Sequence, residues 1–174
     1  MKALYISEEL IIRQMSEQDV LPVCRAAGND TPEEIRYLNR QMTDQRNGEC
    51  ISLLAVYHGM IAGYVFLYYQ CKWGGLGGQG IPGIVDLIVF EPYRRHGIAG
   101  KLMEEAEKLA AEQSDRVYLD VCLSSAYGMA QRLYFRRGYI PDGKGVYYQE
   151  KVCPKNAPCK NDNELTLCLV KKLK

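Results

Sequence analysis

The chain has 174 residues, enough for one domain with a sizeable core, and we expect a single domain over residues 1–174. Its 22 lysines and arginines nearly balance its 21 aspartates and glutamates, which argues against a general attraction to nucleic acid or to an acidic membrane. The N-terminus is too polar for a signal peptide and no apolar run reaches membrane-spanning length, so we expect a cytoplasmic protein.

The cysteines do not form the pattern of a disulfide framework or of a metal site. There are seven, an odd number, and no C-x-x-C pair occurs among them. Only two histidines, His58 and His96, could join them as ligands. We therefore expect reduced thiols and no bound metal.

The chain begins with a predicted strand and two predicted helices. The β-rich run 9–15 favours the strand. Ser16 should cap a helix over residues 17–26, with Asp19 in the capping-box position, and Thr31 should cap a second, longer helix.

Two further strands, 51–57 and 60–69, are joined by His58-Gly59, a two-residue connection typical of a tight antiparallel hairpin. The glycine-rich segment 72–83 then contains Gly75-Leu76-Gly77-Gly78-Gln79-Gly80, which has the letters of the dinucleotide-binding fingerprint. A strand and not a helix follows, so no helix N-terminus could hold a phosphate there. We expect a mobile surface loop or a flap over a substrate cleft.

The next strand, residues 84–90, leads into Arg94-Arg95-His96-Gly97-Ile98-Ala99-Gly100 and then a helix. A glycine-containing loop at this place presents backbone N–H groups at the positive end of the helix dipole, where an anion can bind. Arg94, Arg95 and His96 add donors that suit a phosphate. The segment, called the anion loop below, therefore predicts a site for a pyrophosphate-bearing cofactor.

The remaining elements are a strand at 117–123, a helix at 126–137, and strands that begin at 146 and at 165. Pro141-Asp142-Gly143 predicts a turn, and residues 151–163 are expected to form a polar loop with prolines.

Asp86 is the one ionisable residue in the apolar strand before the anion loop, so its carboxylate must be hydrogen-bonded or face a cavity.

Two motifs, in this order of elements, resemble the GNAT superfamily of N-acetyltransferases over nearly the whole chain. Arg94-x-x-Gly97-x-Ala99 is similar to the family's acetyl-CoA loop, and Leu133-Tyr134-Phe135-Arg136-Arg137-Gly138-Tyr139 is similar to its L-Y-x-x-x-G-F segment. The resemblance implies an α/β fold with helices on both sides of a mixed, mostly antiparallel sheet. About seven strands are implied, splayed at the two central parallel strands.

The resemblance also implies how acetyl-CoA, the expected co-substrate, would bind. Its pyrophosphate would lie on the amides of Arg95 to Gly100. Its pantetheine arm would pair, beside a β-bulge, with the backbone of Leu87, Ile88 and Val89. Many relatives have an asparagine that contacts pantetheine where this chain has Tyr127, whose hydroxyl or ring could replace it.

Two residues correspond to the family's catalytic groups. Tyr134 matches the tyrosine that protonates the departing thiolate, although it could instead be a core aromatic. Asp86 aligns approximately with the acidic residue that deprotonates the amine, with Asp120 as the alternative base. Asp86 could also be a structural carboxylate or an anchor for a substrate ammonium group. His96 fits a phosphate contact or a solvated side chain better than a base.

The function implied is transfer of acetyl from acetyl-CoA to a primary amine of a small molecule or a peptide, by direct attack in a ternary complex. The alternatives are a non-catalytic acyl-CoA-binding or sensing module and a protein-interaction domain that uses the glycine-rich segment. We expect neither nucleic acid nor membrane as a partner. Many relatives are dimers, so a homodimer is a further expectation. The first two helices and the segments 72–83 and 151–163 should select the amine.

Overall fold

The computed structural model describes residues 3–173, whose contacts divide the chain into two compact units. The first comprises Met1–Tyr68 and Ile84–Leu109, and the second comprises Tyr69–Gly83 and Ala110–Lys174. The glycine-rich segment therefore belongs to the second unit, although the strands before and after it lie in the first. Among the helices of the described part of the chain, none combines the length and the apolar composition needed to cross a bilayer.

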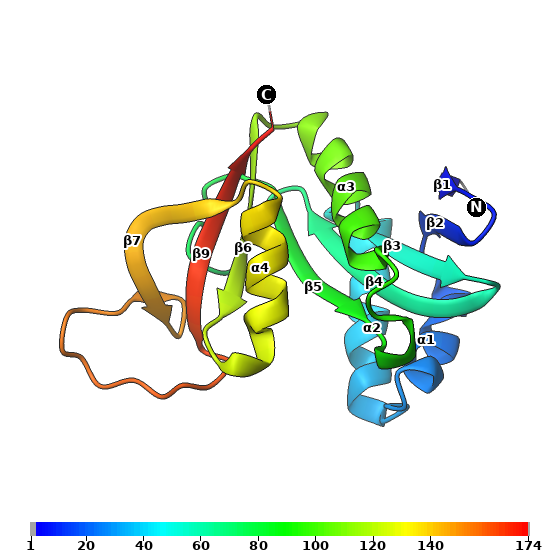
Figure 1. Cartoon of the computed structure of the whole chain (residues 1–174), viewed down its shortest axis with the longest axis horizontal. Helices are drawn as coiled ribbons and strands as arrows, with labels where there is room; N and C mark the ends of the chain where they lie inside the picture. The colour runs from blue at the N-terminus through cyan, green and yellow to red at the C-terminus, as the bar shows by residue number, and fades with distance from the viewer. Residues whose placement is uncertain (1–2, 174) are drawn as a thin grey trace. The chain divides into compact units, whose positions relative to one another are not determined.

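The first unit is built on strands in the order β1-β2-β3-β4-β5, of which β1 to β4 pair antiparallel. Helices α1 and α2 lie side by side on one face of these strands, and α3 lies on the other (Figure 1). The strands are β1 (Ala3–Ile6), β2 (Leu10–Gln14), β3 (Cys50–Tyr57), β4 (Met60–Tyr68) and β5 (Gly83–Val89). The helices are α1 (Val20–Ala26), α2 (Pro32–Arg46) and α3 (Ile98–Ala111), with short 3-10 turns at Glu17–Asp19 and Glu91–Tyr93.

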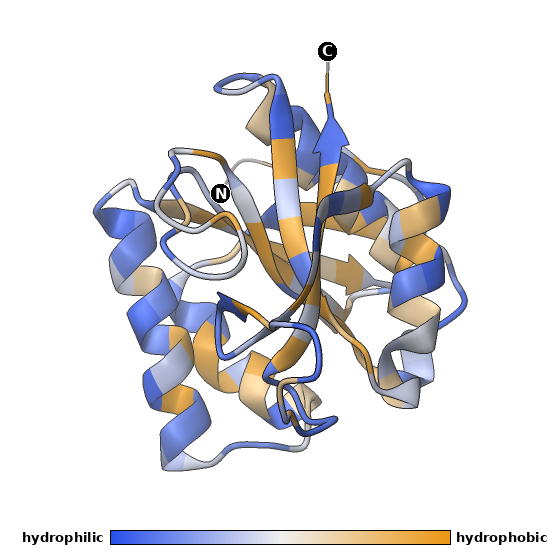
Figure 2. Cartoon of the chain, turned by 90° about the vertical axis from the view of Figure 1, so that its left-hand side faces the viewer, coloured by the Kyte–Doolittle hydropathy of each residue, from blue (hydrophilic) through white to orange (hydrophobic). Residues whose placement is uncertain are grey.

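Strand β4 forms the centre of this unit. Its residues from Ala62 to Tyr68 are buried without interruption, because helices cover both faces of the strand. Hydrophilic residues lie on the outer faces of the helices and hydrophobic residues along the strands (Figure 2). The His58-Gly59 hairpin is confirmed: φ is 47° at His58 and 78° at Gly59, the left-handed pair that a two-residue turn of this kind requires.

The predicted capping box at Ser16 is present, but the helix that follows is shorter than expected. Residues 17–19 form a 3-10 turn, and the α-helix begins at Val20. The Asp19 carboxylate accepts hydrogen bonds from the Ser16 N–H (2.8 Å) and from both Arg13 NH groups (2.7 and 2.8 Å). Burial alone would raise the pKa of Asp19, but the hydrogen bonds from Arg13 and Ser16 outweigh it and lower the pKa to about 2.

Replacing Asp19 with asparagine should therefore lower the free energy of unfolding by about 1–2 kcal/mol at neutral pH. Because the folded-state pKa lies below the ordinary 3.8, this contribution is present above that value and is lost as the pH falls toward 2. Urea unfolding of the two proteins at several pH values measures it. Glu17→Gln, which breaks only an exposed ion pair to Arg46, is the control and should have little effect. A deficit that stays constant down to low pH would contradict the assignment.

The second unit contains strands in the order β6-β9-β7-β8, paired antiparallel, with α4 across one face (Figure 1). Gly83 adds a parallel pairing with Tyr118, so the sheet is mixed and mostly antiparallel, as predicted. The elements are β6 (Arg116–Cys122), α4 (Gly128–Arg136) after a 3-10 turn at Ser125–Tyr127, β7 (Ile140–Tyr148), β8 (Lys151–Val152) and β9 (Leu165–Lys172).

The described residues form nine strands where about seven were expected. The two additional strands are β1, four residues long, and β8, two residues long, both too short to show an alternating pattern. The predicted turn at 141–143 lies inside β7, where the pairing with β9 shifts between Pro141 and Val146. It is therefore an irregularity in a strand and does not connect two elements.

The glycine-rich segment is packed against β6, which differs from the expected surface loop. Leu76 and Ile81 are buried, and the Tyr118 hydroxyl donates to the Trp73 carbonyl (2.5 Å). The half-buried Asp120 carboxylate accepts the Gly75 N–H (3.1 Å). Burial raises the pKa of Asp120. Glycines are needed because the backbone comes this close to its neighbours.

Replacing Gly75 with alanine should lower the free energy of unfolding by about 1–3 kcal/mol, because the new Cβ would lie 2.7 Å from Cys168 Cβ and 2.8 Å from Tyr147 Cζ. Gly128, at the start of α4, has no atom within 4 Å of the same position. Gly128→Ala is therefore the matched control, and it should be neutral or slightly stabilising. Denaturant unfolding compares them, and equal stability of both variants would refute the close packing of the segment.

Candidate active site

The anion loop lies where the sequence predicts it, between β5 and α3. Arg95 (φ 67°) and Gly97 (φ 77°) have left-handed backbones, which turn the chain sharply into the helix. Ile98 is buried and fixes the helix start in the core, while 94–97 are exposed. The Lys101 N–H donates to the Gly97 carbonyl (3.1 Å), the first i to i−4 bond of the helix. The amides before it lie at the positive end of the helix dipole.

Two side chains of the loop already have neighbours within the first unit. The Arg94 Nε–H donates to the Val89 carbonyl (3.1 Å), which ties the loop to the end of β5. The His96 ring lies against the Tyr57 ring, with centroids 5.2 Å apart. Both contacts orient the loop with its exposed cationic face toward solvent, as an anion site requires.

Strand β5 changes character at Asp86. Residues 83 and 84 are buried, whereas Asp86 and Ile88 are exposed and Leu87 and Val89 are half-buried. The φ of Asp86 is 51°, rare for a strand residue other than glycine, and it interrupts the regular strand directly before Leu87, Ile88 and Val89. On the β4 side, a Cβ on Gly63 would lie 2.3 Å from the Ile88 carbonyl oxygen. Only a glycine lets β4 come this close.

The Asp86 carboxylate is hydrogen-bonded by the Tyr37 hydroxyl from helix α2, through a very short contact. Glu34 lies three residues earlier on the same helix and therefore on the same face. Burial first, and then the charge of Asp86, raise the pKa of Glu34. Burial and the Asp86 charge also raise the pKa of Tyr37, which keeps its hydroxyl protonated as a donor. The buried Tyr64 of β4 borders the same group.

Glu34, Tyr37, Tyr64 and Asp86 thus form a cluster of two carboxylates and two phenols, called the carboxylate cluster below. Of these four residues, the sequence predicted a catalytic role only for Asp86. Glu34 lies in the first turn of the helix capped by Thr31, whose hydroxyl accepts the Glu34 N–H (3.3 Å). The i, i+3 spacing of Glu34 and Tyr37 was the available signal, but it does not reveal a partner 49 residues away.

Tyr134 lies in α4 of the second unit. Its side chain is 8% exposed and packs edge-on against Tyr139, with centroids 5.9 Å apart. The predicted base and anion loop belong to the first unit and the predicted acid to the second. That they act in one reaction is part of the function proposed below.

Tyr127 lies at the end of the 3-10 turn before α4. Its hydroxyl donates to the Asn163 side-chain oxygen (3.2 Å), and the Cys122 thiol donates to the Asn163 carbonyl (3.4 Å). The hydroxyl thus contacts the end of the segment 151–163, while the ring remains the part of Tyr127 expected to contact a cofactor.

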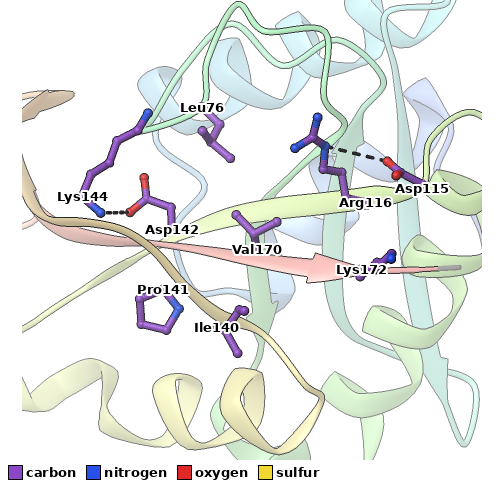
Figure 3. Close-up of a pocket in the computed structure, with 9 residues that line it drawn as sticks. All are labelled: Leu76, Asp115, Arg116, Ile140, Pro141, Asp142, Lys144, Val170 and Lys172. Carbon is purple, nitrogen blue, oxygen red and sulfur yellow. Dashed lines mark hydrogen bonds and ion pairs between the residues drawn. The ribbon is translucent and has the colours of Figure 1, made fainter.

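A pocket of about 430 Å³ lies within the second unit, and none of the predicted site residues lines it (Figure 3). Its walls come from the ends of β6, β7 and β9 and from the glycine-rich segment. The apolar lining is Leu76, Ile140, Pro141 and Val170, and the charged lining is Asp115, Arg116, Asp142, Lys144 and Lys172. Charges of both signs and an apolar wall do not define a reaction centre.

Among residues 3–173, no cluster of three or more metal-ligating side chains occurs.

Comparison with known proteins connects this geometry to a family. The model of the acetyltransferase (GNAT) family matches residues 17–139. An N-alpha-acetyltransferase from Saccharolobus solfataricus is 28% identical over 109 residues, which cover 54% of this chain and 64% of that protein. The match thus spans less than two thirds of the relative's length.

Solved structures show the same fold. An acetyltransferase from Salmonella typhimurium that modifies the N-terminal serine of a ribosomal subunit protein has a TM-score of 0.72 at 11% identity, covering 98% of this chain and 99% of the other. The yncA protein from Salmonella typhimurium, solved with its cofactor acetyl-CoA, has a TM-score of 0.69 at 13% identity, covering 96% and 95%.

The fold is that of the acetyl-CoA-dependent acetyltransferases. The chain belongs to the acetyltransferase (GNAT) family, whose model covers more than half of its length, including the anion loop and the helix of Tyr134. The resemblance carried by the two sequence motifs is thereby confirmed, as is the predicted α/β fold.

Proposed function

We propose that this protein transfers the acetyl group of acetyl-CoA to a primary amine, and that the amine is in the first place the N-terminal α-amine of a peptide or protein. The neighbouring carboxylates of Glu34 and Asp86, in the carboxylate cluster, carry the proposal. Two carboxylates close together favour a cationic ligand, and a primary amine is an ammonium ion at neutral pH. The relatives that act on protein N-termini support the choice of a peptide acceptor.

The anion loop supplies the donor side of the proposed reaction. The amides of Arg95 to Gly100 and the side chains of Arg94, Arg95 and His96 bind the pyrophosphate of acetyl-CoA. The backbone of Leu87, Ile88 and Val89 pairs with the pantetheine amides, as an added strand would. Tyr127 packs against the same arm through its ring.

The chemistry then needs a base, an attack and an acid. Asp86, oriented by the Tyr37 hydroxyl on Oδ2, accepts a proton from the ammonium group, directly or through a water molecule. The neutral amine attacks the thioester carbonyl carbon, the new C–N bond forms and the C–S bond breaks. The departing sulfur takes its proton from Tyr134, and the nitrogen passes its second proton through water back to the tyrosinate. The products are an acetylated amine and free coenzyme A, and Asp86 releases its proton to solvent.

A thiol-release assay with acetyl-CoA tests the proposal. A panel should compare peptides with a free N-terminus, the same peptides with the N-terminus blocked, and small amines. We expect free thiol, and an acetylated product by mass, only where an amine is free. Coenzyme A binding without transfer to any member of the panel would instead favour an acyl-CoA-binding or sensing module.

The expected homodimer stays a prediction, which light scattering would test.

A further inference from the structure

The pocket of the second unit contains two cations that face each other across neighbouring strands. Arg116 of β6 and Lys172 of β9 are directly opposite in the antiparallel register, so their side chains lie close together on the same face of the sheet. The Leu173 N–H donates to the Asp115 carbonyl (2.7 Å), which holds the two strand ends in this register. Like charges placed directly opposite each other repel. An anion bound between them would relieve that repulsion.

The carboxylate next to this pair compensates only part of its charge. Asp115 forms one ion pair with the Arg116 Nε, at 3.8 Å, and both side chains are more than half exposed, where such a pair contributes little. In the described part of the chain, no residue forms a hydrogen bond or an ion pair with the Lys172 ammonium group. The Lys172 ammonium group and the terminal nitrogens of Arg116 are therefore available as donors.

The second carboxylate of the pocket, Asp142, lies at the other end, away from the two cations (Figure 3). Both of its oxygens already accept hydrogen bonds within the second unit. One accepts the Tyr147 hydroxyl (2.5 Å) and the other accepts the Lys144 backbone N–H (2.9 Å). Asp142 therefore does not take up the charge of Arg116 and Lys172.

An apolar wall adjoins the cation pair. Val170 lies two residues before Lys172 in β9 and therefore on the same face, and Ile140 of β7 is opposite Val170. The buried Leu76 of the glycine-rich segment lines the same pocket (Figure 3). The pocket volume of about 430 Å³ lies in the range of small-molecule sites, about 300–1,000 Å³. The pocket thus offers two cations at one end and a hydrocarbon surface beside them.

We propose that this pocket binds a small organic anion with an apolar body, of the class of a medium-chain carboxylic acid. Arg116 and Lys172 bind the carboxylate, and Leu76, Ile140 and Val170 contact the hydrocarbon chain. Both parts of the ligand contribute, because the carboxylate separates the two cations and the chain covers the apolar wall. None of these residues is proposed to bind acetyl-CoA or to transfer a proton, so the binding does not depend on the proposed acetyl transfer.

Methyl NMR of the full-length protein, with octanoate as the probe, tests the site. We expect the methyl signals of Leu76, Ile140 and Val170 to shift and to saturate as octanoate is added. Octanol has the chain without the charge, and acetate has the charge without the chain. Each should bind at least about 10-fold more weakly than octanoate.

Two substitutions test the cation pair. Lys172→Gln and Arg116→Gln should each weaken octanoate binding about 10-fold, because a charged hydrogen bond is lost. Lys151→Gln removes the same charge from an exposed position of β8 outside the pocket, so it is the matched control and should leave the affinity unchanged. Without octanoate, Lys172→Gln should keep or raise Tm, because it removes the repulsion from Arg116. Weaker binding then does not result from unfolding.

Several results would overturn the proposal. Octanol or acetate that binds as tightly as octanoate would show that the pocket does not recognise the combination of charge and chain. Octylamine that binds more tightly would show that the carboxylates dominate. Octanoate that shifts only signals outside the pocket, or that does not saturate, would contradict the site, as would equal losses of affinity in Lys151→Gln and Lys172→Gln.

Discussion

Replacing Tyr134 with phenylalanine should lower kcat for acetyl transfer by about 10²- to 10⁴-fold and leave the affinity for coenzyme A unchanged. The variant removes one hydroxyl from a buried ring and keeps the packing against Tyr139. Without that hydroxyl the thiolate must leave unprotonated or take a proton from water, and either route raises the barrier. Steady-state thiol release gives kcat, and calorimetric titration gives the affinity for coenzyme A.

Tyr68→Phe is the matched control, because it also removes the hydroxyl of a buried tyrosine. That hydroxyl donates to the Asp44 carboxylate (2.7 Å) and contacts Gln41, at the end of α2. We expect a loss of stability of about 1 kcal/mol and an unchanged kcat. If Tyr134→Phe retains the wild-type kcat, or loses no more than the control, Tyr134 is a core aromatic and another group protonates the sulfur.

Replacing Asp86 with asparagine should lower kcat by at least about 10²-fold at neutral pH, because an amide cannot accept the proton of the ammonium group. The loss should shrink as the pH rises, since a growing fraction of the amine is then already neutral. Rates measured over a pH series with one peptide substrate separate this behaviour from a folding defect, which would lower the rate equally at every pH.

Two neighbouring substitutions define what Asp86 does. Glu34→Gln should raise KM for a cationic amine and change kcat little, because it removes the charge of one carboxylate beside Asp86 and leaves the base in place. Tyr37→Phe should lower kcat less than Asp86→Asn, because the hydroxyl orients the carboxylate without touching the amine. If Asp86→Asn changes KM alone, Asp86 anchors the substrate and the proton leaves by another route.

The sequence predicted those parts of the site that depend on neighbours along the chain. The glycines and the following apolar periodicity of α3 placed the anion loop, and His58-Gly59 and the Ser16–Asp19 pair placed a hairpin and a helix start. The conformation of each of these features depends on a few neighbouring residues, through backbone sterics and capping hydrogen bonds.

Contacts between distant segments had no comparable signal. The approach of Tyr37 to Asp86, and of Gly75 to Asp120, joins residues 49 and 45 positions apart, and depends on how the helices and loops pack on the strands. The glycine content of the segment 72–83 was visible, but its cause, close packing on β6, was not. Short strands such as β8 are likewise stabilised by their partners more than by their own residues.

The two compact units cannot be separated by cutting the chain at one place. The backbone passes between the two units at residues 68–69, 83–84 and 109–110, so no single cleavage separates them. A fragment that ends at Leu109 would carry the glycine-rich segment without β6, and would expose Leu76, Ile81 and Cys71 to water. Such truncations should aggregate, and this fold should tolerate new chain termini at the exposed turn around Asn156 far better than at any of the three crossings.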